Sequence, residues 1–149
     1  MDVEEQLKTA IAELSKQFGS EFSTPSLPLS GCNNWVYLIN HNGEAWALRI
    51  PKDEMSALIG RRGTAMLRHL NKMRPDLQVP RLIHESETDQ YTAMQYLPGE
   101  TIDSWDSSRL SDERRHQLLD SLAAFFFELW TCPVAETGMF PLSLPLPEI

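Results

Sequence analysis

The chain has 149 residues, of which 42% are hydrophobic and 23% charged, a composition typical of one globular domain with a substantial core. Its formal net charge of -8 and pI of about 4.9 argue against a nucleic-acid-binding protein and against attraction to anionic membrane surfaces. There is no apolar run of about 20 residues to span a membrane, and the acidic N-terminus does not resemble a signal peptide. Cys32 and Cys132 show no metal-binding spacing, so we expect a cytoplasmic protein with free thiols.

Residues 2–18 predict an amphipathic helix that packs on the domain following it. Acidic residues fill its first turn, Lys16 lies near its end, and Gly19 is expected to terminate it. Apolar residues recur at three- and four-residue steps: Val3, Leu7, Ile11, Leu14 and Phe18.

Residues 30–51 predict a small polar loop followed by a β-hairpin. The apolar runs Trp35 to Ile39 and Ala45 to Ile50 flank Asn42-Gly43, a strong hairpin signal. Residues 22–29, which precede the loop, carry two prolines and should form only an edge or interrupted strand. Arg49 stands inside the second hairpin strand, where a charge needs a partner or a function. A loop of small residues before a hairpin with a cation on the returning strand is typical of a phosphate-binding lid.

A helix is predicted from Met55 or Arg61 to Met73, with Met66, Leu70 and Met73 as its apolar stripe, widened by Leu67. Gly60 and Gly63 weaken its first half. The helix is basic, with no Asp or Glu between Glu54 and Asp76, and its charges are expected to form a solvated face.

Two further strands, residues 80–85 and 90–96, are predicted before a turn at residues 97–100. A helix then begins after Ser111 and ends before Pro133. Its segment from Phe125 to Trp130 carries apolar side chains on several sides, which favours burial against something else. Self-association or docking through this segment is therefore expected if the chain is complete.

The motifs Ser30-Gly31-Cys32-Asn33-Asn34-Trp35-Val36-Tyr37, Val79 to His84 and Tyr91 to Glu100 occur in this order. They resemble the loop, the fourth and fifth strands and the interlobe hinge of the aminoglycoside phosphotransferase family, the small-molecule branch of the kinase-like fold. The resemblance covers roughly Phe22 to Pro133. Arg49 stands where the family usually has the strand lysine that reaches the nucleotide phosphates.

This resemblance implies an α+β fold: a protein-kinase-like N-lobe with a twisted antiparallel sheet of about five strands, one packed helix, and a helix at each end. It divides the chain into an N-terminal helix (1–21), the N-lobe (22–100) and a truncated start of the second lobe (101–149). It implies ATP and Mg as cofactors. The implied nucleotide-binding residues are Ser30, Gly31, Cys32, Asn33, Asn34, Val36, Arg49, Gln95, Tyr96 and Leu97.

The chain departs from the family pattern at two places. In kinases a glutamate of this helix holds the strand cation. By the family's spacing its position is near Gly63, and this chain has no acidic residue there. No His-Gly-Asp-x-x-x-x-Asn loop is found either, so no catalytic or metal-binding residue is assigned. Arg49 either still binds phosphate or is a strand residue paired with a nearby acid. We expect weak or absent Mg-ATP binding and no phosphate transfer by this chain alone. A noncatalytic nucleotide- or protein-binding module that docks through the C-terminal helix is the alternative.

Overall fold

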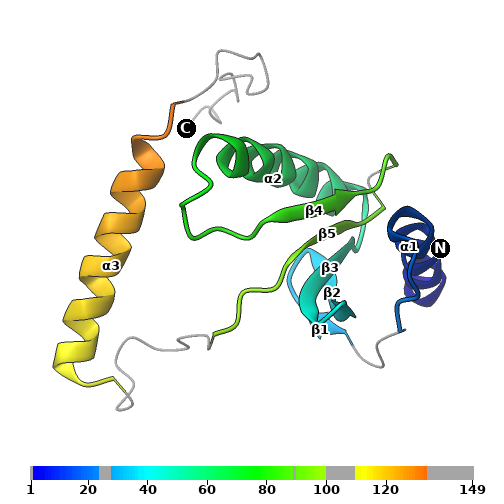
Figure 1. The fold of residues 1–149 in the computed structure, drawn as a ribbon, viewed down its shortest axis with the longest axis horizontal. Helices are drawn as coiled ribbons and strands as arrows, with labels where there is room; N and C mark the ends of the chain where they lie inside the picture. The colour runs from blue at the N-terminus through cyan, green and yellow to red at the C-terminus, as the bar shows by residue number, and fades with distance from the viewer. Residues whose placement is uncertain (1, 24–27, 89, 100–109, 134–149) are drawn as a thin grey trace, which may run out of the picture.

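The computed structural model of the chain describes residues 2–23, 28–88, 90–99 and 110–133. Within these residues three helices and five strands follow one another (Figure 1): α1 (Val3–Phe18), β1 (Leu29–Ser30), β2 (Asn34–His41), β3 (Glu44–Pro51), α2 (Glu54–Met73), β4 (Leu82–Glu85), β5 (Thr92–Gln95) and α3 (Asp112–Trp130). The strands form one antiparallel sheet in the order β1-β2-β3-β5-β4. The predicted α+β fold is thus confirmed. None of the helices in this part of the chain combines the length and apolar character needed to cross a membrane.

Strands β2 and β3 form a hairpin in the middle of the sheet. This confirms the hairpin predicted from Asn42-Gly43. Asn42 and Gly43 have φ angles of 52° and 84°, and two successive positive φ angles are what a type I′ turn requires. The N–H of Gly43 donates to Asn40 Oδ1 at 3.1 Å, which braces the turn. Pairing runs without interruption from His41↔Glu44 to Asn34↔Pro51. The register therefore fixes Arg49 opposite Val36.

The strand before the loop is short, as its prolines imply. Only Leu29 and Ser30 pair with β2, opposite Val36 and Trp35. Pro28 cannot donate a ladder hydrogen bond, so the strand begins after it and stays at the sheet edge. Pro25 lies outside the described residues.

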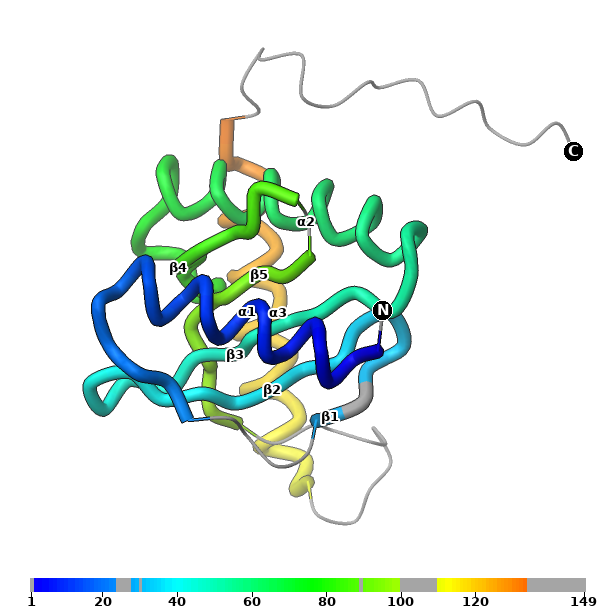
Figure 2. Tube along the Cα trace, turned by 90° about the vertical axis from the view of Figure 1, so that its right-hand side faces the viewer, coloured from blue at the N-terminus to red at the C-terminus, as the bar shows by residue number. Residues whose placement is uncertain are grey.

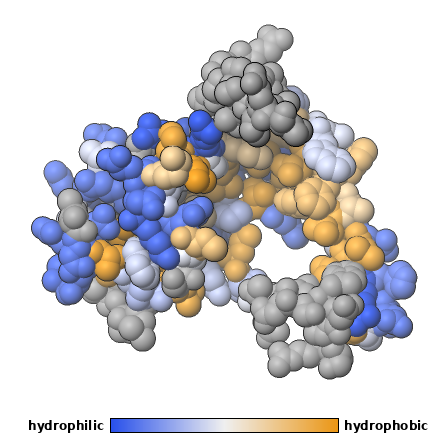
Figure 3. Space-filling view, turned by 180° about the vertical axis from the view of Figure 1, so that it is seen from behind, coloured by the Kyte–Doolittle hydropathy of each residue, from blue (hydrophilic) through white to orange (hydrophobic). Residues whose placement is uncertain are grey.

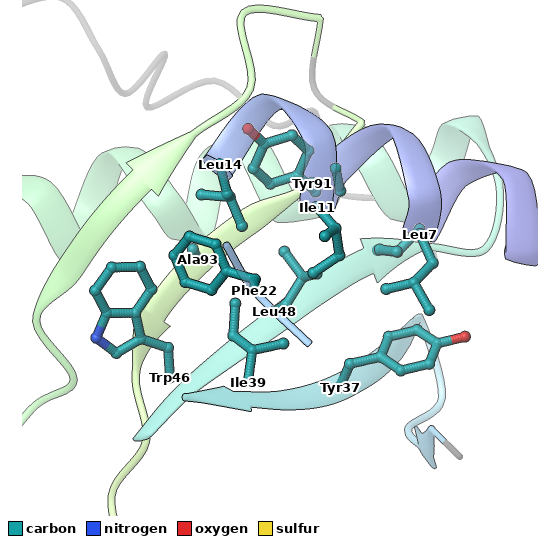
Figure 4. Packing of buried hydrophobic residues seen from close by; sticks show 12 residues of the cluster. Leu7, Ile11, Leu14, Phe22, Tyr37, Ile39, Trp46, Leu48, Tyr91 and Ala93 are labelled. Atoms are coloured by element: carbon teal, nitrogen blue, oxygen red, sulfur yellow. The ribbon is translucent and has the colours of Figure 1, made fainter. Parts of the chain in front are cut away.

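Helix α1 covers one face of the sheet (Figures 1 and 2). Gly19 ends it in the left-handed conformation, with a φ of 64°, as predicted. Its inward side chains meet alternating residues of the strands (Figure 4). The core they form consists of Leu7, Ala10, Ile11, Leu14, Phe22, Tyr37, Ile39, Trp46, Leu48, Ile50, Tyr91 and Ala93. Because strand side chains alternate between faces, Arg49 and Thr92 point to the opposite face, here called the inner face.

Helix α2 begins at Glu54, close to the earlier of the two predicted starts. Asp53 caps it by accepting a hydrogen bond from the N–H of Ser56 at 2.7 Å. The predicted apolar stripe is wrong in part, because Met66 and Met73 are both 42% exposed and only Leu70 is buried. The other buried residues of α2 are Ser56 and Thr64. The side of α2 that meets the sheet is therefore lined by small side chains near its start.

Helix α3 is capped by Ser111, whose Oγ accepts a hydrogen bond from the N–H of Arg114 at 3.3 Å. The C-terminal end of α3 contacts the end of α2, where Phe125 and Leu129 pack on a small cluster of Leu70, Leu77 and Cys132. No residue of α3 is buried within the described part of the chain. Figure 3 shows hydrophobic side chains gathered over α3 and the adjoining end of α2. Of the predicted start of the second lobe (101–149), residues 101–109 and 134–149 lie outside the described residues.

Candidate functional site

A pocket lies between the first half of α2 and the inner face of the sheet. Its sheet side is lined by Asn34, Arg49, Pro51, Glu85 and Thr92, and its helix side by Ser56, Ala57, Gly60, Arg61 and Thr64. Its interior volume is about 20 Å³, enough for roughly one water molecule. The pocket can therefore admit one small polar group, such as an oxygen of an anion, while the rest of a ligand would lie along the inner face.

Arg49 is half-buried at this pocket, with Val36 and Thr92 as its cross-strand neighbours. Within the described residues, the structure gives its side chain no ion pair or hydrogen bond. A guanidinium carries five N–H donors in a planar fork that suits phosphate oxygens. The predicted acidic partner of Arg49 is thus not found among the described residues, and phosphate binding by Arg49 stays a prediction.

The predicted loop, residues 30–34, is held from the end of β3. Lys52 donates from Nζ to the carbonyl oxygen of Gly31 at 2.6 Å and from its backbone N–H to that of Asn33 at 3.1 Å. The same Nζ lies 4.5 Å from the centre of the Trp35 ring, a cation–π contact. Cys32 is exposed and free, and the N–H of Gly31 donates to the Asn34 carbonyl at 3.1 Å. Sequence analysis missed Lys52, although its place directly after the cation-bearing strand was a signal.

The start of α2 adds a fixed negative charge beside the pocket. The Asp53 carboxylate accepts hydrogen bonds from Ser56. The bond from the backbone N–H has the larger effect and that from the hydroxyl group the smaller one, and both lower the pKa of Asp53 below its usual range. Asp53 therefore remains ionised at neutral pH and fixes the direction in which α2 leaves β3.

The predicted hinge lies at the end of β5. The N–H of Gln95 donates to the Arg81 carbonyl at 2.8 Å, and that of Tyr96 to the Ala45 carbonyl at 3.0 Å. The N–H of Leu97 has no such partner within the described residues, and its side chain is 44% exposed. Gln95 lies three residues beyond Thr92, or about 10 Å along the strand from the row that holds Arg49. The hinge and Arg49 thus lie at the two ends of the pairing between β3 and β5.

The carboxylate at this site comes from β4 rather than from α2. Glu85 lines the pocket and forms an ion pair with Arg68 of α2. Helix α2 has no acidic residue after Glu54. The sequence alone does not place Glu85 at the pocket, because its position depends on the pairing of β4 with β5.

In the described part of the chain, two histidines pack against aromatic rings and two contact backbone carbonyl oxygens. His41 and His84 join the aromatic cluster around Phe18, with ring centres 5.5 and 6.1 Å from that of Phe18. His69 Nε2 lies 2.7 Å from the Pro133 carbonyl oxygen, and His116 Nδ1 lies 2.8 Å from that of Asp112. Among the residues that are described, no group of three or more potential ligands could hold a metal ion.

Comparisons with known proteins show the family and the fold of the chain. A family model described as the phosphotransferase enzyme family matches residues 26–145. No curated protein matches the chain. The structure of the gentamicin complex of APH(2'')-IIa aligns with a TM-score of 0.69 and 22% identity, over 94% of this chain and 43% of that one.

Two further solved structures are similar over 87% of this chain and 42% of their own. They are the streptomycin–ATP complex of APH(2'')-IIa, with a TM-score of 0.66 and 22% identity, and the ADP-bound aminoglycoside phosphotransferase APH(2'')-Ib, with 0.65 and 23%. At these identities the likeness shows the fold. The chain spans less than half the length of the structures it matches.

Proposed function

Because the chain belongs to the phosphotransferase enzyme family, we propose that it provides the nucleotide-binding lobe of an ATP-dependent phosphotransferase. The observation that carries this proposal is Arg49, which lies in the inner-face pocket without an acidic partner in the described residues. The loop held by Lys52 lies on one side of it and the exposed end of β5 on the other. Two of the similar structures are described as complexes with ATP and ADP.

In this proposal the Arg49 guanidinium donates to the nucleotide phosphates, the loop at residues 30–34 covers them, and the backbone of Gln95 to Leu97 meets the adenine edge. Mg would accompany the nucleotide and would neutralise part of the negative charge on its phosphates. The pocket has room for only about one small group. Binding is therefore expected to be weak, with a Kd on the order of 1 mM, which is a binding free energy of about −4 kcal/mol.

Replacement of Arg49 with alanine tests the site. We expect Arg49→Ala to weaken Mg-ATP binding by at least about tenfold, since charge-assisted hydrogen bonds to phosphate are lost. Two-dimensional NMR titration of the isolated chain with Mg-ATP would measure the Kd. Arg62→Ala is the matched control, because Arg62 is exposed on α2 and does not line the pocket. Unchanged affinity in Arg49→Ala would contradict the proposed site.

Phosphate transfer by the chain alone is not part of the proposal. The sequence has no His-Gly-Asp-x-x-x-x-Asn loop to supply the carboxylate and metal-linked amide that phosphoryl transfer uses. ATP-dependent phosphorylation of any small hydroxyl or amine compound by the purified chain would overturn this part.

A second candidate function, docking through α3, is favoured by the exposure of its apolar side chains. Leu119, Leu122, Phe126, Phe127 and Trp130 are 39% to 80% exposed. We expect the chain to self-associate through them, and we expect Phe127→Ser with Trp130→Ser to shift the chain to monomers. Sedimentation equilibrium over a range of concentrations would measure this. Monomers at every concentration before substitution would exclude self-association.

A further inference from the structure

We propose that Arg68 is a positioning residue for the nucleotide site, because it holds the Glu85 carboxylate against α2 and prevents Glu85 from pairing with Arg49. This inference rests on the proposed function, since it concerns the availability of Arg49 for phosphate groups. It goes further by assigning a role to an ion pair that touches no nucleotide itself.

The sheet register places Arg49 and Glu85 on the same face. Arg49 pairs with Thr92 across β3 and β5, and Thr92 pairs with Glu85 across β5 and β4. Directly opposed residues of antiparallel strands share a face, so the three form one row across the inner face. Neighbouring strands lie about 4.8 Å apart, which puts the Arg49 and Glu85 backbones about 10 Å apart. Thr92, a short side chain, stands between them. An extended arginine and an extended glutamate can meet across it.

The register puts Glu85 in the same row as Arg49. Arg68 of α2 binds Glu85. The two form an ion pair between α2 and β4, and the side chain of Glu85 is only 26% exposed. Both Glu85 and Arg49 line the same pocket. With Arg68 in place, the negative charge of Glu85 is matched from the helix side, and Arg49 has no acidic partner within the described residues.

An ion pair between Glu85 and Arg49 would change the direction in which the Arg49 guanidinium points. In protein kinases the acid that pairs with the strand lysine comes from the helix. Here the acid comes from β4, while the loop at residues 30–34 joins β1 and β2 on the other side of Arg49. Pairing with Glu85 would therefore turn the guanidinium away from the loop. It would also place a carboxylate beside the phosphates.

A double substitution tests whether Arg68 keeps Glu85 from pairing with Arg49 or only holds α2 against β4. We expect Arg68→Gln to raise the Kd for Mg-ATP by at least about fivefold, because the freed Glu85 pairs with Arg49. In Arg68→Gln with Glu85→Gln, affinity should return to within about twofold of the unaltered chain, since the competing charge is gone. If Arg68 only tethers α2, the double variant will stay as weak as Arg68→Gln, and the inference fails. Arg81→Gln is the control, because Arg81 forms an ion pair with Glu44 outside the pocket.

Two readouts keep this inference distinct from the proposed function. If the unaltered chain does not bind Mg-ATP, the proposed function fails. If it binds, and Arg68→Gln binds equally well, only the inference fails. The Arg49 Nε–H NMR signal, recorded without nucleotide, tests the pairing directly. It should move in Arg68→Gln and return in the double variant, whereas an unmoved signal would overturn the inference.

Discussion

Leu14→Ala is expected to lower the free energy of unfolding by about 2–5 kcal/mol, the range seen when a buried leucine is truncated. Leu14 is 0% exposed and belongs to the cluster that joins α1 to the sheet. The loss combines the transfer of a smaller side chain with the cavity left between α1 and the strands. Urea unfolding followed by circular dichroism would measure it.

Leu58→Ala is the matched control for Leu14→Ala. Leu58 also lies in a helix, but it is 39% exposed, so its truncation should change stability by less than about 0.5 kcal/mol. A loss below about 1 kcal/mol for Leu14→Ala would show that α1 contributes little to the core. The packing of α1 also concerns the proposed site, because α1 covers the other face of the strands that carry Arg49 and Thr92 on the inner face.

Local signals predicted most of the fold. The apolar spacing from Val3 to Phe18 predicted α1, and Asn42-Gly43 predicted the hairpin, because both are set by neighbouring residues. The burial of α2 was predicted less well. Periodicity indicated a stripe through Met66 and Met73, but the side of α2 that meets the sheet carries Ser56 and Thr64. Small residues allow close packing, and a hydrophobicity pattern does not detect them.

Sequence reasoning reached the parts of the candidate site that are close in sequence. The loop and Arg49 belong to one hairpin unit, and the register brings Asn34 and Arg49 to one pocket. Glu85 could not be assigned, because β5 inserts between β3 and β4 although it follows both in the chain. Only that order places Thr92 between Arg49 and Glu85 in one row. The sequence shows the residues of this row but not that they are neighbours.

Asn71→Leu is expected to destabilise the fold by about 2–6 kcal/mol, because it leaves two backbone groups without a partner, each at about 1–3 kcal/mol. The Asn71 amide joins α2 to the chain entering β4. Its Nδ2 donates to the Pro80 carbonyl oxygen at 3.1 Å, and its Oδ1 accepts from the Leu82 N–H at 2.7 Å. Leucine fills a similar volume but can replace neither bond. Denaturant unfolding would give the change in free energy.

Asn71→Asp divides the contribution of Asn71 into its two hydrogen bonds. A carboxylate still accepts from the Leu82 N–H but cannot donate to Pro80, so an intermediate loss is expected. Lys72→Ala is the control, since Lys72 is exposed one position further along α2.

Asn71 follows Arg68 by three residues, so a helix freed from β4 at Asn71 should also loosen the Arg68–Glu85 ion pair. Mg-ATP affinity should then fall in Asn71→Leu and stay unchanged in Lys72→Ala. A stable Asn71→Leu variant with unaltered affinity would show that α2 is held over the pocket by its other contacts.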